Sequence, residues 1–67
     1  MKKNELLTKK IEEHFENRND FFKLFKLKEE TYKKRMKEGR LYLRQVVQTK
    51  ELLNLTKEET SFLFFEI

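Results

Sequence analysis

The side chains that could support catalysis or bind a metal are few, and their spacing suits neither task. The chain of 67 residues has a single histidine, His14, and no cysteine. Its adjacent carboxylate pairs, Glu12–Glu13 and Glu58–Glu59, point in different directions on a helix. The sequence contains no glycine-rich phosphate loop and no metal-ligand spacing. Because catalysis needs a placed nucleophile, acid–base pair or metal, we expect neither an enzyme nor a bound cofactor.

Positive charge is concentrated in the middle third of the chain. Residues 23–44 carry nine lysines and arginines against three glutamates, a net charge of +6, whereas residues 1–22 sum to 0 and residues 45–67 to −2. Within this segment the run LKEETYKKRMKEGR, residues 27–40, places Tyr32 and Met36 four residues apart. That spacing puts both on one helical face. The run therefore predicts a docked helix whose charges face a polyanion.

Apolar periodicity and capping residues predict about five short helices. The expected helices cover residues 5–15, 20–25, 28–38, 44–53 and 57–65. The first has an apolar stripe of Leu7, Ile11 and Phe15. Gly39 should end the third helix because glycine adopts a left-handed conformation readily. Before the fifth helix, TKEE forms a capping box between Thr56 and Glu59.

The fourth and fifth predicted helices carry apolar residues that we assign either to the core or to a surface. In and beside the fourth helix, after an extended connector at residues 40–43, we expect four residues to face inward: Leu43, Val46, Val47 and Leu53. The apolar tail SFLFFEI has two interpretations, completion of the monomer core or a dimer surface. The candidate dimer surface consists of Phe62, Phe64, Phe65 and Ile67.

Length and composition set the frame for these helices. We expect one all-α domain over residues 1–67, close to the lower size at which a chain buries enough surface to fold alone, so self-association is expected. No stretch approaches 18 apolar residues and no signal-peptide core follows the start, which predicts a cytoplasmic protein that does not span a membrane.

The second and third predicted helices are separated by about three residues, which is typical of a helix-turn-helix motif, here at about residues 19–38. The predicted motif core consists of Phe22, Phe25, Leu27, Tyr32 and Met36. In this motif the second helix lies in the major groove with its N-terminal residues at the base edges. Residues expected to contact phosphates are Lys23, Lys26, Thr31, Lys37, Arg40 and Arg44.

Residues 7–65 resemble small phage repressors of the Cro and lambda-repressor helix-turn-helix family, in the short form from phages of low-GC Gram-positive bacteria. Three stretches carry the resemblance: KKIEEHF, NDFFKLFKLKEETYKKRMKEG and KELLNLTKEETSFLFF. It implies a homodimeric repressor that binds double-stranded DNA in a bacterial cytoplasm. It also implies that the base-reading residues are Lys28, Glu29, Glu30, Lys33 and Lys34.

Three positions depart from the family pattern. Phe22 stands where the family usually has alanine, Lys26 where the turn usually has glycine, and Lys28 where a serine commonly caps the second motif helix. These departures favour an alternative, in which a small phage or mobile-element protein uses the same scaffold to bind and inhibit a host or phage protein. A third hypothesis is non-specific binding of nucleic acid by a basic helix.

Overall fold

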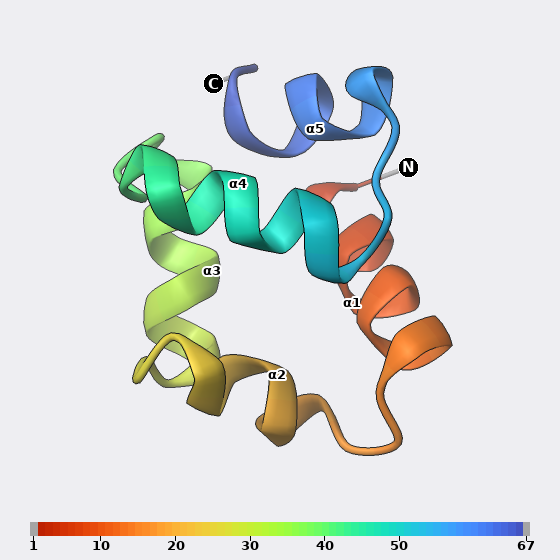
Figure 1. The fold of residues 1–67 in the computed structure, drawn as a ribbon. Helices are drawn as coiled ribbons and strands as arrows, with labels where there is room; N and C mark the ends of the chain where they lie inside the picture. The colour runs from red at the N-terminus through yellow and green to blue at the C-terminus, as the bar shows by residue number, and fades with distance from the viewer. Residues whose placement is uncertain (1, 67) are drawn as a thin grey trace.

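The computed structural model describes residues 2–66, and its helices begin and end close to the predicted positions (Figure 1). The helices are α1 (Lys3–His14), α2 (Arg18–Leu24), α3 (Glu29–Lys37), α4 (Leu43–Leu52) and α5 (Lys57–Phe64). No strand occurs in the described part of the chain. The predicted fold class, a compact all-α bundle of about five short helices, is confirmed.

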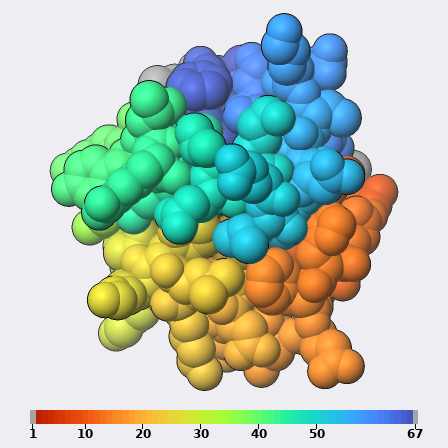
Figure 2. Space-filling model, viewed as in Figure 1, coloured from red at the N-terminus to blue at the C-terminus, as the bar shows by residue number. Residues whose placement is uncertain are grey.

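Four helices, α1, α2, α3 and α5, form a ring, and α4 crosses it. α1 contacts α2, α2 contacts α3, α3 contacts α5, and α5 returns to α1, while α4 packs against α5. Figure 1 shows α3 and α1 on opposite sides of the bundle, with α4 running between them. In the space-filling view α4 covers the centre of this face, with α2 below it and α5 above (Figure 2). One apolar cluster with residues from all five helices fills the interior.

Aromatic rings join α2 to α3. The Phe21 ring is fully buried and lies 5.1 Å from the ring centroids of both Phe22 and Phe25, and 5.7 Å from that of Tyr32. Tyr32 in turn lies 5.4 Å from Phe22 in an edge-to-face contact. A seven-residue helix such as α2 is not stable by itself, so this packing is what holds it in place. Phe22, where the family pattern has alanine, is thus part of the aromatic cluster.

A buried hydrogen-bond chain connects α3 to α4. The hydroxyls of Tyr32 and Thr49 are 2.6 Å apart, and the Thr49 hydroxyl lies 2.8 Å from the Gln45 carbonyl oxygen, to which it donates. Burial raises the pKa of the Tyr32 phenol above its ordinary value, so the group stays protonated and can act as a donor. These hydrogen bonds satisfy polar groups whose burial without a partner would destabilise the fold.

Three helices end in the same turn. In α2 the Lys26 N–H donates to the Lys23 carbonyl, and the Leu27 N–H donates to that of Phe22, the two hydrogen bonds of a Schellman motif. α3 and α4 end with the equivalent pairs of bonds. The motif requires one residue with positive φ, and the three residues that take it are Lys26 (56°), Gly39 (68°) and Asn54 (51°). Glycine and asparagine tolerate this conformation, whereas lysine pays a steric cost.

The start of α5 is anchored as the capping box predicts. The Glu59 N–H donates to the Thr56 hydroxyl at 3.1 Å, and the Thr56 N–H donates to the Glu59 carboxylate at 2.9 Å. The same carboxylate pairs with Lys10 of α1 at 2.9 Å. These hydrogen bonds hold the pKa of Glu59 below its ordinary value, and the bond from the Thr56 backbone has the largest effect. The cap therefore also links the first helix to the last.

Two of the four residues expected to face inward at α4 do not. Leu43 is 69% exposed and Val47 is 44% exposed, whereas Val46 and Leu53 are buried as predicted. The prediction was wrong because it counted only apolar residues. Thr49 follows Val46 at a spacing of three and is fully buried through its hydrogen bond to Tyr32. The inward face of α4 is therefore rotated away from Val47.

The C-terminal aromatics divide between the two predicted roles. Phe64 is buried in the monomer core, which corrects its place in the candidate dimer surface. Phe62 is half-buried against that core, and Phe65 is 61% exposed. Ile67 lies outside the described residues. Among residues 2–66, no helix is long and apolar enough to cross a membrane.

Replacing Lys26 with glycine should stabilise the protein relative to Lys26→Ala. Both variants remove the charge, but only glycine relieves the positive φ, so we expect the glycine variant to be more stable by about 1 kcal/mol. Urea denaturation followed by circular dichroism measures the difference. Equal stability of the two variants would mean that Lys26 carries no conformational strain.

Candidate nucleic-acid interface

α3 presents two faces of different chemistry. Its inward face holds Tyr32 and Met36, both essentially inaccessible to solvent. Its outward residues follow from the helical period, which places residues 30, 34 and 37 on the side opposite this stripe. Glu30, Lys34 and Lys37 are all exposed, as is Lys28 at the position before the helix. The sequence-predicted docked helix is thus present, with a mainly basic outward surface.

All five residues predicted to form the core of the motif lie inside or against the core. Tyr32, Met36, Phe22 and Phe25 are buried, and Leu27 is half-buried against them. Lys28 occupies the N-cap position of α3, where its side chain makes no capping hydrogen bond. The first turn of α3 instead contains two carboxylates, which interact favourably with the positive end of the helix dipole.

Glu29 and Lys33 form a polar clamp on the side of α3 that faces α1 and α2. The Lys33 ammonium donates to the Glu29 carboxylate at 2.7 Å and to the Thr8 hydroxyl of α1 at 3.3 Å. Arg18 of α2 lies 3.8 Å from the same carboxylate. The hydrogen bond from Lys33 is the main cause that holds the pKa of Glu29 below its ordinary value. The clamp ties the start of α3 to both preceding helices.

This geometry separates the five residues predicted to read bases. Lys28, Glu30 and Lys34 are exposed, whereas Glu29 and Lys33 are half-buried and occupied by each other. The sequence could not make this distinction, because two Glu-to-Lys pairs overlap, 29 with 33 and 30 with 34. Both have the four-residue spacing that allows a helical ion pair. Among residues 2–66, Glu29 and Lys33 form an ion pair, whereas Glu30 and Lys34 do not.

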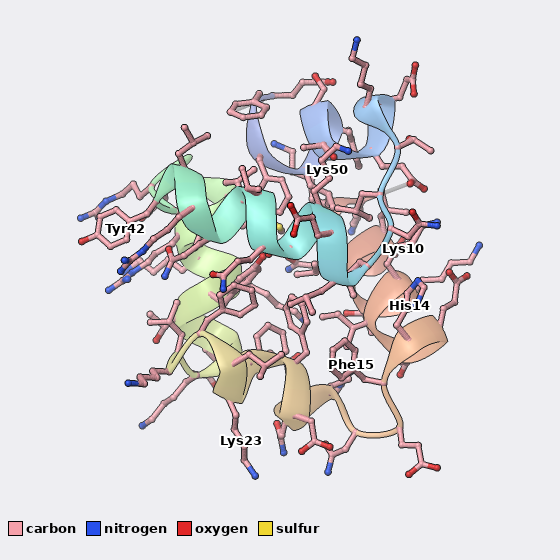
Figure 3. The ribbon with its side chains drawn as sticks, viewed as in Figure 1. Lys10, His14, Phe15, Lys23, Tyr42 and Lys50 are labelled. Carbon is pink, nitrogen blue, oxygen red and sulfur yellow. The ribbon has the colours of Figure 1, made fainter. Side chains whose placement is uncertain are left out.

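The residues predicted to contact phosphates lie in α3 and in the segments before and after it. Lys23, Lys26, Lys37, Arg40 and Arg44 are exposed, and Thr31 is half-buried. Figure 3 shows the labelled Lys23 and Tyr42 projecting from the bundle beyond α2 and the start of α4.

Tyr42 is a member of this surface that the sequence predictions missed. Its ring lies 5.9 Å from the guanidinium carbon of Arg44 and is 63% exposed. A cation at this distance is attracted to the face of the ring. The signal in the sequence is an aromatic residue between Arg40 and Arg44, in the run RLYLR.

Apolar side chains flank the basic surface in two shallow grooves. One lies between the end of α2 and α4, where Leu24, Leu43 and Val47 are exposed and Lys26 and Arg44 stand at the margin.

The other apolar groove is lined by α3, α4 and α5, with the exposed Phe65 and Leu43 on its walls and Met36 at its base. Leu43 borders both grooves, so the exposed apolar surface is continuous across the start of α4.

Side chains that could ligate a metal are scattered in the described part of the chain. No group of three histidine, cysteine or carboxylate side chains could hold a metal ion there, and His14 is exposed at the end of α1. Comparisons with protein-family models, with curated proteins and with solved structures find no match to this chain. The function must therefore be argued from the chemistry of this surface.

Removing the Glu29 charge should weaken the fold at neutral pH and do so less in acid. Because the folded-state pKa of Glu29 lies below its unfolded value, near 4.5, its stabilisation is complete above that value. It is lost as the pH falls through the folded pKa. We expect Glu29→Gln to cost about 0.5 kcal/mol at pH 7 and progressively less as the pH falls through the folded-state pKa.

The matched control for the Glu29 experiment is Glu30→Gln, which removes a first-turn carboxylate of the same helix that has no ion pair among residues 2–66. Urea denaturation at a series of pH values compares the two variants. An equal loss in both variants would contradict the clamp.

Proposed function

We propose that this protein is a sequence-specific repressor that binds double-stranded DNA through a helix-turn-helix formed by α2 and α3. The observation that carries the proposal is that α3 has two faces of different chemistry. Its inward face is fixed by Tyr32 and Met36, while its outward face is exposed and mainly basic. A helix held in this way can enter the major groove without loss of its own packing.

The exposed charges suggest how the contacts divide. Lys34 lies on the outward side of α3, and Lys28 is exposed at the N-cap position before it. Side chains at these positions would meet base edges, where lysine donates to guanine acceptors. The phosphate contacts are assigned to exposed residues at the end of α3 and in the segments on either side of it: Lys23, Lys26, Lys37, Arg40 and Arg44. Arg44 is supported for this role by the Tyr42 ring beneath it.

Conformational strain at Lys26 supports a role for its charge. Of the three Schellman turns, only the one between α2 and α3 has a residue that strongly disfavours positive φ. Strained residues are commonly found at functional sites, where the side chain offsets the cost. In the proposed complex Lys26 contacts a phosphate, so the glycine variant that stabilises the fold should bind DNA less tightly.

Two copies of the chain are needed for useful specificity, because one recognition helix reads only a few base pairs and a homodimer spans two half-sites. Phe65 and the groove beside it are the surface that we assign to the second copy. An exposed phenylalanine next to an apolar groove can bury area in a reciprocal contact. Phe65 lines the same groove as Met36 and Gly39, so this surface adjoins the end of α3.

A second candidate function is inhibition of a host or phage protein. The observation that favours it is the groove between α2 and α4, in which the exposed Leu24, Leu43 and Val47 adjoin Lys26 and Arg44. Such a groove suits an amphipathic segment with acidic residues. This function requires a complex with one protein that persists at high salt, together with no selective binding of duplex DNA.

Replacing Lys34 with alanine should weaken binding to the preferred duplex about tenfold, because one base contact is lost. The duplex is first selected from a randomised pool, and its affinity is then measured by fluorescence anisotropy over a series of salt concentrations. A scrambled duplex tests specificity, for which we expect a preference of about 10³ or more.

The control for the Lys34 experiment is Lys50→Ala, which removes an exposed lysine of α4 that Figure 3 shows far from Tyr42 and Lys23. It should bind as the unmodified protein does. Equal losses from the two substitutions would remove α3 from the interface. Equal affinity for selected and scrambled duplexes would support the third hypothesis, non-specific binding by a basic helix.

Replacing Phe65 with serine should shift the protein from dimer to monomer, because the exposed ring no longer buries apolar area. Sedimentation equilibrium measures the association constant, which we expect to fall at least tenfold. The control is Leu52→Ser, which removes an exposed apolar residue from the C-terminal end of α4. A dimer that persists in Phe65→Ser would place the interface elsewhere.

A further inference from the structure

We infer that Glu30 is a specificity-determining residue that accepts a hydrogen bond from the exocyclic amino group of a cytosine in the major groove. The inference rests on the proposed DNA-binding function and goes further, because it names one base that the protein requires. It also narrows the expectation drawn from the resemblance, in which Glu29 and Glu30 were both among the base-reading residues.

The three carboxylates of the basic segment have different surroundings. Glu29 is paired with Lys33 and approached by Arg18, and Glu38 lies 3.4 Å from Arg40. Glu30 is exposed, and none of the ion pairs among residues 2–66 includes it. It is therefore the carboxylate of this segment that has no ion-pair partner among residues 2–66.

The spacing of Glu30 makes its lack of a partner informative. Lys34 follows it by four residues, the same interval at which Glu29 and Lys33 pair at 2.7 Å. On the outward side of α3 no corresponding pair forms within 4.0 Å. An acceptor and a donor thus stand one helical turn apart on the same exposed face, and both remain free to bind an external partner.

A free carboxylate on this face opposes binding to phosphates. Glu30 lies in the first turn of α3, within a surface whose other exposed charges include Lys28, Lys34 and Lys37. Its charge repels the DNA backbone, so for a protein that bound any duplex it would only reduce affinity. A contact with a base donor offsets this repulsion at the correct sequence and leaves it in force at all others.

The chemistry of the base edges selects cytosine. An ionised carboxylate only accepts hydrogen bonds, and the cytosine N4 amino group is a donor in the major groove. Guanine N7 and O6 and thymine O4 are acceptors, which a carboxylate repels. Adenine presents an N6 donor beside the N7 acceptor, so it suits a carboxylate less well than cytosine does. Lys34 has the opposite requirement and suits guanine N7 and O6. Because residues four apart are about 6 Å apart along a helix, the cytosine and guanine should lie one or two base pairs apart.

Two substitutions at Glu30 test this assignment. The duplex selected with the unmodified protein is altered at each cytosine in turn, and the affinities of the unmodified protein, Glu30→Gln and Glu30→Ala are compared by fluorescence anisotropy. We expect the unmodified protein to prefer cytosine at one position by about tenfold or more. Glu30→Ala should lose that preference. Glu30→Gln should shift it toward adenine, whose amino group and N7 suit an amide.

Scrambled DNA and a matched variant complete the experiment. Both Glu30 variants should bind a scrambled duplex several-fold more tightly than the unmodified protein, because a repulsive charge is gone. Glu38→Gln removes a carboxylate of the same segment that is paired with Arg40, and it should leave the base preference at that position intact.

The alternative explanation is that Glu30 only stabilises the start of α3. In that case both Glu30 substitutions change the affinity for every duplex by the same factor and lower the midpoint of thermal unfolding. That result would overturn this inference and leave the proposed function standing. Failure of the unmodified protein to bind any duplex selectively would overturn both.

Discussion

The aromatic packing between α2 and α3 is the interaction on which the rest of this structure depends. α2 has seven residues and cannot persist alone, yet it carries the rings of Phe21 and Phe22 that fix the side of α3 bearing Tyr32. The Tyr32 hydroxyl then joins α3 to α4 through Thr49. If this cluster were lost, α3 would have no fixed orientation and its charged face no defined direction.

The orientation of α3 also determines which charges remain available. The rotation of α3 that buries Tyr32 also places Glu29 and Lys33 against α1 and α2. There the two side chains pair, and Lys33 also donates to Thr8. The same rotation leaves Glu30 and Lys34 outward. A single packing event thus divides two chemically identical pairs into a structural pair and a pair exposed to solvent. The proposed readout of DNA uses only the second pair.

Apolar periodicity and capping residues sufficed to predict five helices, the buried motif residues, the helix end at Gly39 and the cap at Thr56, because these depend on neighbours in the chain. Predictions that depended on the third dimension were less successful. The exposure of Leu43 and Val47 follows from a hydroxyl contact between Tyr32 and Thr49, seventeen residues apart, which hydrophobicity does not reveal. Likewise, overlapping Glu-to-Lys spacings cannot tell which pair closes, since that depends on where α1 lies.

Nuclear magnetic resonance mapping of the backbone amides during titration with duplex DNA tests the central claim most directly. The account predicts that shift changes concentrate on α3, the turns on either side of it and the start of α4. Residues of α1 that face away from α3, such as Glu12, should change little. Changes centred on α1 would contradict the account. So would shift changes on the α2–α4 groove alone that appear with a protein partner and never with DNA.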